Sequence, residues 1–213
     1  MNRSIMHLAF AVLVSFATAA LAQENTQQRD TTAAASPAVE TRLALRDLWS
    51  EHIVWVRNYV LGTHVKDQAM AQAAETEIVA NANGIADAIE PFYGQEARDA
   101  LFELLAGHWT AIKHYNDATQ ANNSSDAQNA VTELTENAKQ ISQFLSEANP
   151  NWPEDTLVSL LSTHGAHHVA QIDQIKAKDY EAEAKTWREM RSHMNTIADA
   201  LTDGLVKQFP DKF

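Results

Sequence analysis

The sequence predicts an all-α protein, and three observations lead to that class. Glycine and proline are scarce, at 6 and 5 of 213 residues, whereas alanine, leucine, glutamine and glutamate are abundant. Apolar residues recur at helical spacing, and no run alternates between apolar and polar residues as a half-buried strand does. The same residue pattern also returns every 56 positions. Together these features predict an up-down bundle of six helices, built from three 56-residue helical-hairpin repeats.

The first 22 residues have the composition of a secretory signal peptide. Arg3 precedes an apolar run from Leu8 to Ala17, and Ala20-Leu21-Ala22 supplies a cleavage motif. Residues 23–38 are polar and alanine-rich, which predicts a flexible linker, and residues 39–213 then form one helical domain. No later apolar run is long enough to span a bilayer. We therefore expect an exported protein without membrane insertion, located in the periplasm or outside the cell.

Charge and cysteine content exclude several classes of function. The formal net charge of −12 becomes −13 when Arg3 leaves with the signal peptide, and such a surface disfavours nucleic acid and anionic lipid. The absence of cysteine excludes disulfides, thiol catalysis and thiolate metal sites. The sequence also lacks a glycine-rich phosphate loop and the H-E-x-x-H motif of zinc proteases. A metal ion bound by histidine or carboxylate remains compatible with this composition.

The repeat is defined by similar residues at intervals of 56. Seven triplets share this interval: His52/His108/His164, Asn81/Asn137/His193, Leu48/Leu104/Leu160, Leu45/Leu101/Leu157, Ile85/Ile141/Ile197, Ile89/Leu145/Leu201 and Glu77/Glu133/Glu189. Three repeats run through residues 41–208 without an insertion, and each has room for two helices.

Turn-forming residues divide the domain into helices. The predicted helices span residues 39–62, 66–91, 95–118, 124–147, 153–177 and 180–207. The clearest start signal lies between Asn149 and Asp155, where prolines and acidic residues occupy positions that a first helical turn accepts. In the first helix, His52 lies within an apolar stripe that extends from Leu45 to Val60. The short connections imply that neighbouring helices are antiparallel.

Six polar residues occupy core positions and are expected at one height in the bundle. Residues equidistant from the turn of a helical hairpin lie level with each other, and this holds for His52, Asn81, His108, Asn137, His164 and His193. In the first two repeats we expect a buried polar layer, in which each histidine bonds to the asparagine of its own hairpin. A second possibility is a ring in which the three equivalent histidines converge on a pseudo-threefold axis. That ring requires their three helices to be innermost.

The third repeat carries additional metal-ligating residues. His168 lies one turn after His164, and two imidazoles four residues apart on a helix can chelate one ion. On the last helix, Glu189 precedes His193 by one turn and is level with His168. We therefore predict a metal site formed by His164, His168, Glu189 and His193, suited to Zn²⁺, Ni²⁺, Cu²⁺ or Fe²⁺. His167 is an alternative ligand in place of His168.

Two resemblances bear on this interpretation. The segments LWSEHIVWVRN, FLSEANPNW and LTDGLVKQFPDKF, with N-x-x-x-I in the even helices, resemble a family of exported bacterial helical proteins that has no established activity. This likeness implies export and helices but no reaction. The segment HGAHHVAQI resembles the H-x-x-x-H-x-x-Q segment of DinB-like metal-binding helical bundles, which have four helices rather than six. That likeness implies His164 and His168 as ligands, with His108 or His193 as the third.

These observations predict an exported bundle that binds a transition-metal ion between its last two helices, in storage, sequestration or sensing. One alternative is a metal-free bundle that binds a partner protein or a small apolar ligand. Another is a metal-dependent hydrolase-type enzyme, in which an ion with an open coordination position activates water. No residue of the sequence identifies a substrate or a catalytic role.

Overall fold

The computed structural model describes residues 35–213, which contain helices and no β-strand. The elements are α2 (Pro37–His64), α3 (Gln68–Asp87), α4 (Glu90–Gln120), α5 (Ser124–Ala148), α6 (Glu154–Ala177), α7 (Tyr180–Gln208) and the short 3₁₀-helix η1 (Pro210–Lys212). The all-α prediction is therefore confirmed. Within this part of the chain, no helix combines the length and hydropathy needed to cross a bilayer. The predicted signal peptide, residues 1–22, and linker residues 23–34 lie outside the described residues.

The predicted and observed helices differ most between α3 and α4. The predicted spans were 66–91 and 95–118, whereas α3 ends at Asp87 and α4 begins at Glu90, with Pro91 in its first turn. A proline is accepted there because the first N–H groups of a helix have no intrahelical partner. The break expected at Gly94 is present inside α4 as a kink, with φ 83° and ψ 175°. Glycine adopts this positive φ without the steric penalty of a side chain.

The same tight turn joins the helices of each hairpin. Lys66, Asn122 and Lys178 have φ values of 61°, 57° and 60°, and these three residues are 56 positions apart. The residue after each one caps the next helix: the side chains of Asp67, Asn123 and Asp179 accept hydrogen bonds from the backbone N–H groups three residues on. Such caps satisfy a donor at the helix start and fix where the helix begins.

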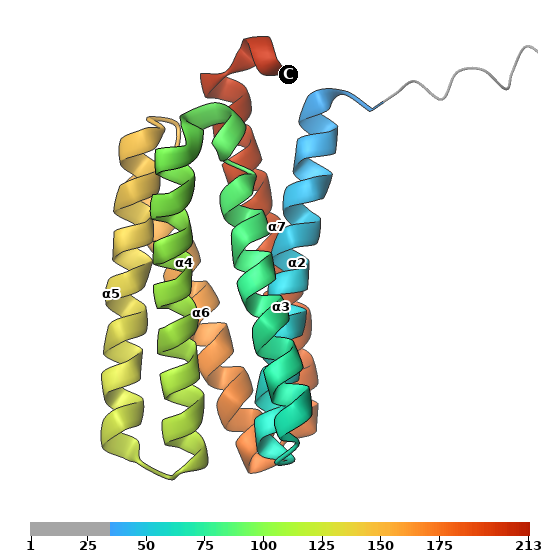
Figure 1. Ribbon diagram of the computed structural model, residues 1–213, viewed down its shortest axis with the longest axis vertical. Coiled ribbons are helices and arrows are strands. Elements are labelled where there is room, and N and C mark those ends of the chain that lie inside the picture. The colour runs from blue at the N-terminus through green and yellow to red at the C-terminus, as the bar shows by residue number, and fades with distance from the viewer. Residues whose placement is uncertain (1–34) are drawn as a thin grey trace, which may run out of the picture. The chain divides into compact units, whose positions relative to one another are not determined.

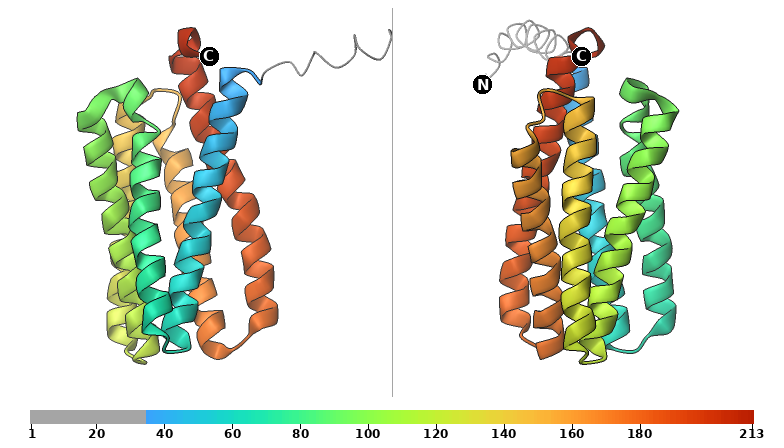
Figure 2. Two further views of the ribbon diagram at one scale, coloured as in Figure 1. Left: turned by 45° about the vertical axis from the view of Figure 1, so that its right-hand side comes forward. Right: turned by 90° about the vertical axis from the view of Figure 1, so that its left-hand side faces the viewer.

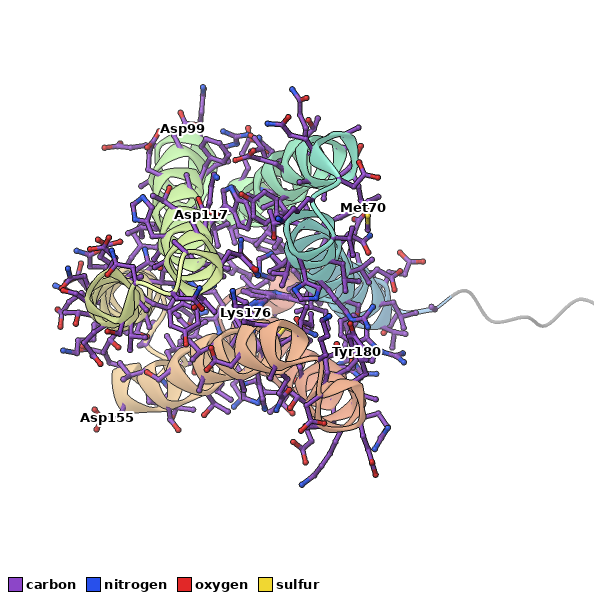
Figure 3. The ribbon with its side chains drawn as sticks, turned by 90° about the horizontal axis from the view of Figure 1, so that it is seen from below. Met70, Asp99, Asp117, Asp155, Lys176 and Tyr180 are labelled. Carbon is purple, nitrogen blue, oxygen red and sulfur yellow. The ribbon has the colours of Figure 1, made fainter. Side chains whose placement is uncertain are left out.

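The six helices form a closed ring. Each helix packs against the next one along the chain, and α7 packs against α2. Successive helices run in alternating directions (Figures 1 and 2). The helices α2, α4 and α6 also contact one another, so they form the inner part of the ring. Seen from one end, the three hairpins surround a core filled with side chains (Figure 3).

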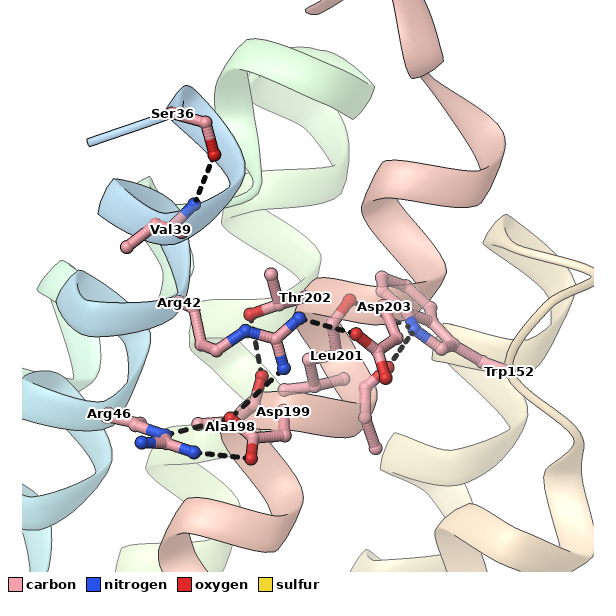
Figure 4. A network of polar contacts seen from close by, with 11 residues as sticks. Ser36, Val39, Arg42, Arg46, Trp152, Ala198, Asp199, Leu201, Thr202 and Asp203 are labelled. Carbon is pink, nitrogen blue, oxygen red and sulfur yellow. Dashed lines mark hydrogen bonds and ion pairs between the residues drawn. The ribbon is translucent and has the colours of Figure 1, made fainter. Parts of the chain in front are cut away.

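Ion pairs join the first and last helices of the ring (Figure 4). The Arg46 guanidinium makes two hydrogen bonds to Asp199, at 2.8 and 2.6 Å. Arg42 pairs with Asp203 at 2.6 Å and with Asp199 at 3.3 Å. The hydrogen bonds from Arg46 lower the pKa of the Asp199 carboxyl group. Because partly exposed pairs contribute about 0–1 kcal/mol each, they set the position of α7 on α2 more than they stabilise the fold.

Buried apolar side chains form two clusters, one toward each end of the bundle. The first includes Leu45 and Trp49 of α2, and the second includes Val56 and Val60 of the same helix. His52 lies between them in the sequence and is itself buried. Burial of each large apolar side chain contributes about 1.5–3 kcal/mol, so these clusters supply most of the favourable free energy of folding. The polar residues between the two clusters gain no such free energy from burial.

The segment between α5 and α6 is held to α7 by a buried tryptophan. The indole N–H of Trp152 points to the carbonyl oxygens of Ala200 and Leu201, at 3.2 and 3.3 Å (Figure 4). Gly204 lies one turn further along α7, and a Cβ atom there would be 1.9 Å from the Trp152 Nε1 atom. Two segments singled out in the sequence, FLSEANPNW and LTDGLVKQFPDKF, thus meet at this contact.

We expect Gly204→Ala to destabilise the protein. Displacing the buried indole costs about 1–3 kcal/mol through overpacking, which exceeds the gain of about 1 kcal/mol from replacing a helical glycine. Chemical denaturation of both proteins measures the difference in the free energy of unfolding. Gly84→Ala is the matched control, because its Cβ would meet only the end of the flexible Leu48 side chain, at 3.0 Å. A Gly204→Ala protein as stable as Gly84→Ala would contradict the close contact.

Candidate metal centre

Four histidines meet in the core where the three inner helices converge. His52 comes from α2, His108 from α4, and His164 and His168 from α6. Their exposed fractions are 7%, 5%, 1% and 1%. One ring nitrogen of each lies within 4.8 Å of the corresponding nitrogens of the other three. The closest pair is formed by the Nε2 atoms of His164 and His168, which are 3.1 Å apart.

The separation of the four rings suits a single ion. The six distances between ring centres range from 4.4 to 6.2 Å. Tetrahedral coordination with metal–nitrogen distances of about 2.0–2.1 Å would place the ring centres roughly 5 Å apart. The ring centres are thus spaced as a single tetrahedral ion requires, whereas the ring nitrogens, which lie within 4.8 Å of one another, must approach further to coordinate it.

The sequence positions these rings through its repeat and one departure from it. The interval of 56 residues places His52, His108 and His164 at equivalent positions on the inner helices. One turn further along, α2 and α4 carry the buried apolar residues Val56 and Ile112. His168 occupies the equivalent position on α6, so this helix alone contributes two imidazoles, on one face at a spacing of four residues.

Most ring nitrogens of the cluster have no hydrogen-bond partner. These atoms are Nε2 of His52, both ring nitrogens of His108, and Nδ1 of His164 and His168. Each buried polar atom without a partner costs about 1–3 kcal/mol, and native structures contain few of them. Among residues 35–213 these five atoms are therefore not satisfied by the protein itself, and each ring has a nitrogen that could coordinate an ion.

Burial keeps the four imidazoles uncharged. It lowers the pKa of His52 to about 3 and that of His108 to about 4. The pKa values of His164 and His168 lie well below the usual 6.5, first because of burial and then because the other histidines are close. A neutral imidazole has one nitrogen with a free lone pair, which is the form that binds a metal ion.

The asparagines of the layer bond to the backbone and not to the histidines. Asn81 and Asn137 are buried, and their amide groups donate to the carbonyl oxygens of Leu48 and Leu104, each at 2.9 Å. The side-chain oxygens of both asparagines have no partner. The expected hydrogen bond between His52 and Asn81 is therefore wrong. In the second hairpin Asn137 is close enough to raise the pKa of His108 as a side-chain hydrogen-bond partner, although the two groups do not meet the geometry of a well-formed hydrogen bond.

The structure separates the four residues that the sequence grouped as metal ligands. His164 and His168 face the axis and meet His52 and His108. Glu189 is exposed, with its carboxylate 3.8 Å from the Lys185 ammonium group. His193 is half-buried, and its Nε2 atom is 2.8 Å from the carbonyl oxygen of Leu160.

The reason for this separation is the direction in which each helix faces. The helix α7 packs against α6 and α2 on the outer part of the ring, so its residues reach the flank of α6. The inner face of α6 is turned toward α2 and α4. The signal for the observed set was already in the sequence, because the ring of three equivalent histidines was the second possibility.

A buried ion pair lies beyond the cluster on the same side of α6. Gln171, one turn after His168, donates to the Glu183 carboxylate at 3.0 Å, and Arg57 makes two hydrogen bonds to that carboxylate at 2.6 and 3.0 Å. The hydrogen bonds from Arg57 lower the pKa of Glu183. Because Arg57 balances this charge, the carboxylate does not neutralise a cation held by the histidines.

The surroundings of the cluster limit its chemistry. A cavity of about 20 Å³ borders His52, His108 and His164, and its other walls are the apolar side chains of residues such as Trp49 and Trp109. This space accommodates one water-sized molecule. Within the described residues, no charged side chain lines this cavity. Four imidazoles would match the four-coordinate geometry of a closed metal site.

Comparison with known proteins gives no match: no protein-family model fits the sequence, and no curated protein or solved structure is significantly similar to it. The chemistry of the cluster is therefore the basis for a functional assignment.

We expect the metal-free protein to unfold in mild acid. The four histidines have pKa values below 6.5 in the folded state, so below pH 6.5 the unfolded state binds more protons and stability falls as the pH decreases. At pH 5 His52 and His108 each lower the free energy of unfolding by roughly 2 kcal/mol, and His164 and His168 act in the same direction. A loss of this size is a large part of the total stability of about 5–15 kcal/mol of a typical domain.

Circular dichroism between pH 7.5 and 4.5 measures this transition. The carboxyl groups with lowered pKa values titrate below this range, so the histidines dominate the change. His108→Leu should move the midpoint to lower pH, whereas His114→Leu, which removes an exposed ring bonded to Glu133, should not. A metal-free protein that stays equally stable down to pH 4.5 would show that the cluster is hydrated or already protonated.

Proposed function

We propose that this protein binds one transition-metal ion through His52, His108, His164 and His168, in storage, sequestration or sensing of that ion. One observation carries the proposal: four uncharged imidazoles converge in the buried core, with ring nitrogens within 4.8 Å and most of them without partners among the described residues. Coordination of an ion would use the free lone pairs of these nitrogens, whose burial without a partner otherwise lowers the stability of the fold. An arrangement that served only to stabilise the fold would supply hydrogen-bond partners instead.

The donor set narrows the class of ion. Neutral imidazole nitrogens suit zinc, copper, nickel and iron, whereas calcium and magnesium need oxygen ligands. None of the four donors carries a negative charge, so the ion keeps its full charge inside an apolar core. A monovalent ion such as Cu⁺ involves the smallest desolvation cost among these metals. We include it with Zn²⁺, Cu²⁺, Ni²⁺ and Fe²⁺ as the ions to test.

The proposal includes the architecture that brings the ligands together, an up-down bundle of three 56-residue hairpin repeats. Two recurring features support it. The hairpin turns share a residue with positive φ at an interval of 56. Residues 81, 137 and 193 each bond to the carbonyl oxygen of the residue 33 positions earlier, at 2.8–2.9 Å. Such a repeat places one histidine of each inner helix at the same height.

We further propose that the ion is bound after export, in the periplasm or outside the cell. The basis is the sequence of residues 1–22, which has the regions of a signal peptide. Folding outside the cytoplasm would expose the site to the metals of that compartment.

A second candidate function is the binding of a small apolar molecule without a metal. The observation in its favour is a cavity of about 30 Å³ in the first apolar cluster, lined only by side chains such as Leu105, Ile141 and Leu161. This volume suits a diatomic molecule but excludes larger ligands. The histidine cluster has no role in this function, so we regard metal binding as better supported.

We expect one ion per chain and a higher melting temperature in its presence. Protein purified without an affinity tag and stripped with a chelator is titrated with each metal while elemental analysis and thermal unfolding are recorded. A ligand at 100 times its dissociation constant adds about 2.7 kcal/mol of stability. His108→Leu should lose tight binding of the ion and the stabilisation that comes with it, and His114→Leu should retain both. The absence of any shift in the wild-type protein with all five ions would refute the proposal.

The metal-free His108→Leu protein tests the same cluster independently. Both ring nitrogens of His108 lack partners, so replacing the ring by an apolar side chain of similar size should raise the free energy of unfolding by about 1–3 kcal/mol at pH 7. Denaturant unfolding in the presence of a chelator provides the measurement. A large loss of stability would mean that His108 has hydrogen-bond partners in solution and serves the fold.

A further inference from the structure

We propose that His167 and His193 form a second, half-buried metal-binding position, through which ions reach the buried cluster. This inference rests on the proposed function, because it assigns an entry route to the same site. The cluster itself is nearly inaccessible, since His164 and His168 are each 1% exposed. A buried metal site needs a path by which the ion enters and loses its water.

The hydrogen bond of His193 leaves its other nitrogen ready for coordination. The Nε2 atom lies 2.8 Å from the carbonyl oxygen of Leu160, and a carbonyl oxygen only accepts. Nε2 therefore carries the proton, and Nδ1 has the free lone pair. Metal-binding histidines commonly have one nitrogen bonded to a backbone carbonyl, which fixes the tautomer and the ring orientation.

His167 lies against His193 at a distance that suits a shared ion. The centres of the two rings are 5.4 Å apart, with an angle of 66° between their planes. Two imidazoles on one tetrahedral ion have ring centres roughly 5 Å apart. Nδ1 of His167 is buried without a hydrogen-bond partner. The exposed Glu189 is close enough to affect the pKa of His167, and its negative charge attracts cations to this rim.

The rim pair adjoins the buried cluster. His167 precedes His168 on α6, and it is close enough to His168 to contribute to the lowering of its pKa. Adjacent residues on a helix point in directions about 100° apart. His167 on the flank of α6 and His168 on its inner face are therefore separated by about 100° around the helix axis, and an ion held by His167 would pass through this angle to reach His168.

The other hairpins show that the backbone hydrogen bond alone does not require histidine. Asn81 and Asn137 make the same bond at the positions equivalent to His193. The positions equivalent to His167 are occupied by Trp55 and Ala111. Two imidazoles therefore face each other here only in the hairpin that also carries the extra ligand His168.

His193→Asn separates the two roles, because asparagine preserves the bond to the Leu160 carbonyl and removes the ligand. We measure the rate of Zn²⁺ uptake from a coloured chelator by stopped-flow absorbance, followed by occupancy and melting temperature at equilibrium. Uptake should slow by about tenfold or more, because the incoming ion loses one of its two ligands at the rim, and a loss of about 1.4 kcal/mol on the way in lowers a rate tenfold. Equilibrium occupancy and melting temperature should stay within error of wild type. His114→Asn is the matched control and should load at the wild-type rate.

Two further results would overturn this inference. The first is an unchanged uptake rate in both His193→Asn and His167→Ala. The second concerns His108→Leu, which lacks the complete buried site but retains the rim pair. This variant should bind one Zn²⁺ weakly, and the double variant His108→Leu/His193→Asn should not. If wild type loads an ion and His108→Leu binds none, the rim position is refuted and the buried site stands. If the rim pair binds and the cluster of wild type stays empty, the proposed function fails instead.

Discussion

The structure depends on one constraint, which is the placement of four uncharged imidazoles in a core that offers them almost no hydrogen bonds. Side chains of this kind are held there because their helices approach closely and pack the rings against one another, at angles between 21° and 88°. The outer helices contribute to this arrangement. Asn81, Asn137 and His193 each reach across a hairpin to a carbonyl oxygen of an inner helix, which fixes the relative height of the two helices. The apolar clusters on both sides shield this layer from bulk solvent.

The sequence alone defined the helices and the height of the polar layer, but it left the direction of each residue undetermined. Turn residues and the interval of 56 depend on local conformation, so the ends of α5, α6 and α7 were predicted to within one residue. The number of residues from a hairpin turn gives only the height of a residue along the bundle. By this count Glu189 is level with His168. Whether two level residues face each other depends on how the ring closes. That closure follows from the long-range packing of α7 on α2, which no local pattern encodes.

The third hairpin differs from the other two in a consistent way. Where α2 and α4 carry Val56 and Ile112, α6 carries His168. The outer helix α7 carries His193, whereas the equivalent positions of α3 and α5 are Asn81 and Asn137. These replacements turn a symmetric layer of three imidazoles into one with four donors and an adjacent pair at the rim. These differences all lie on one hairpin, so they make the cluster asymmetric although each hairpin packs against the next one in the ring.

The closure of the ring of helices determines when, during folding, the four imidazoles come together. The inner histidines are contributed by the first, third and fifth helices of the domain, and the ring is complete only when the last helix docks on the first through Arg42, Arg46 and their partners. A chain without its last helix cannot close the ring of helices, so it does not hold the four imidazoles in the arrangement described. A polypeptide that crosses a membrane as an extended thread would therefore carry no cargo from the compartment where it was synthesised. If the chain is exported and binds a metal as we propose, the place of folding would contribute, with relative affinity, to which ion it acquires.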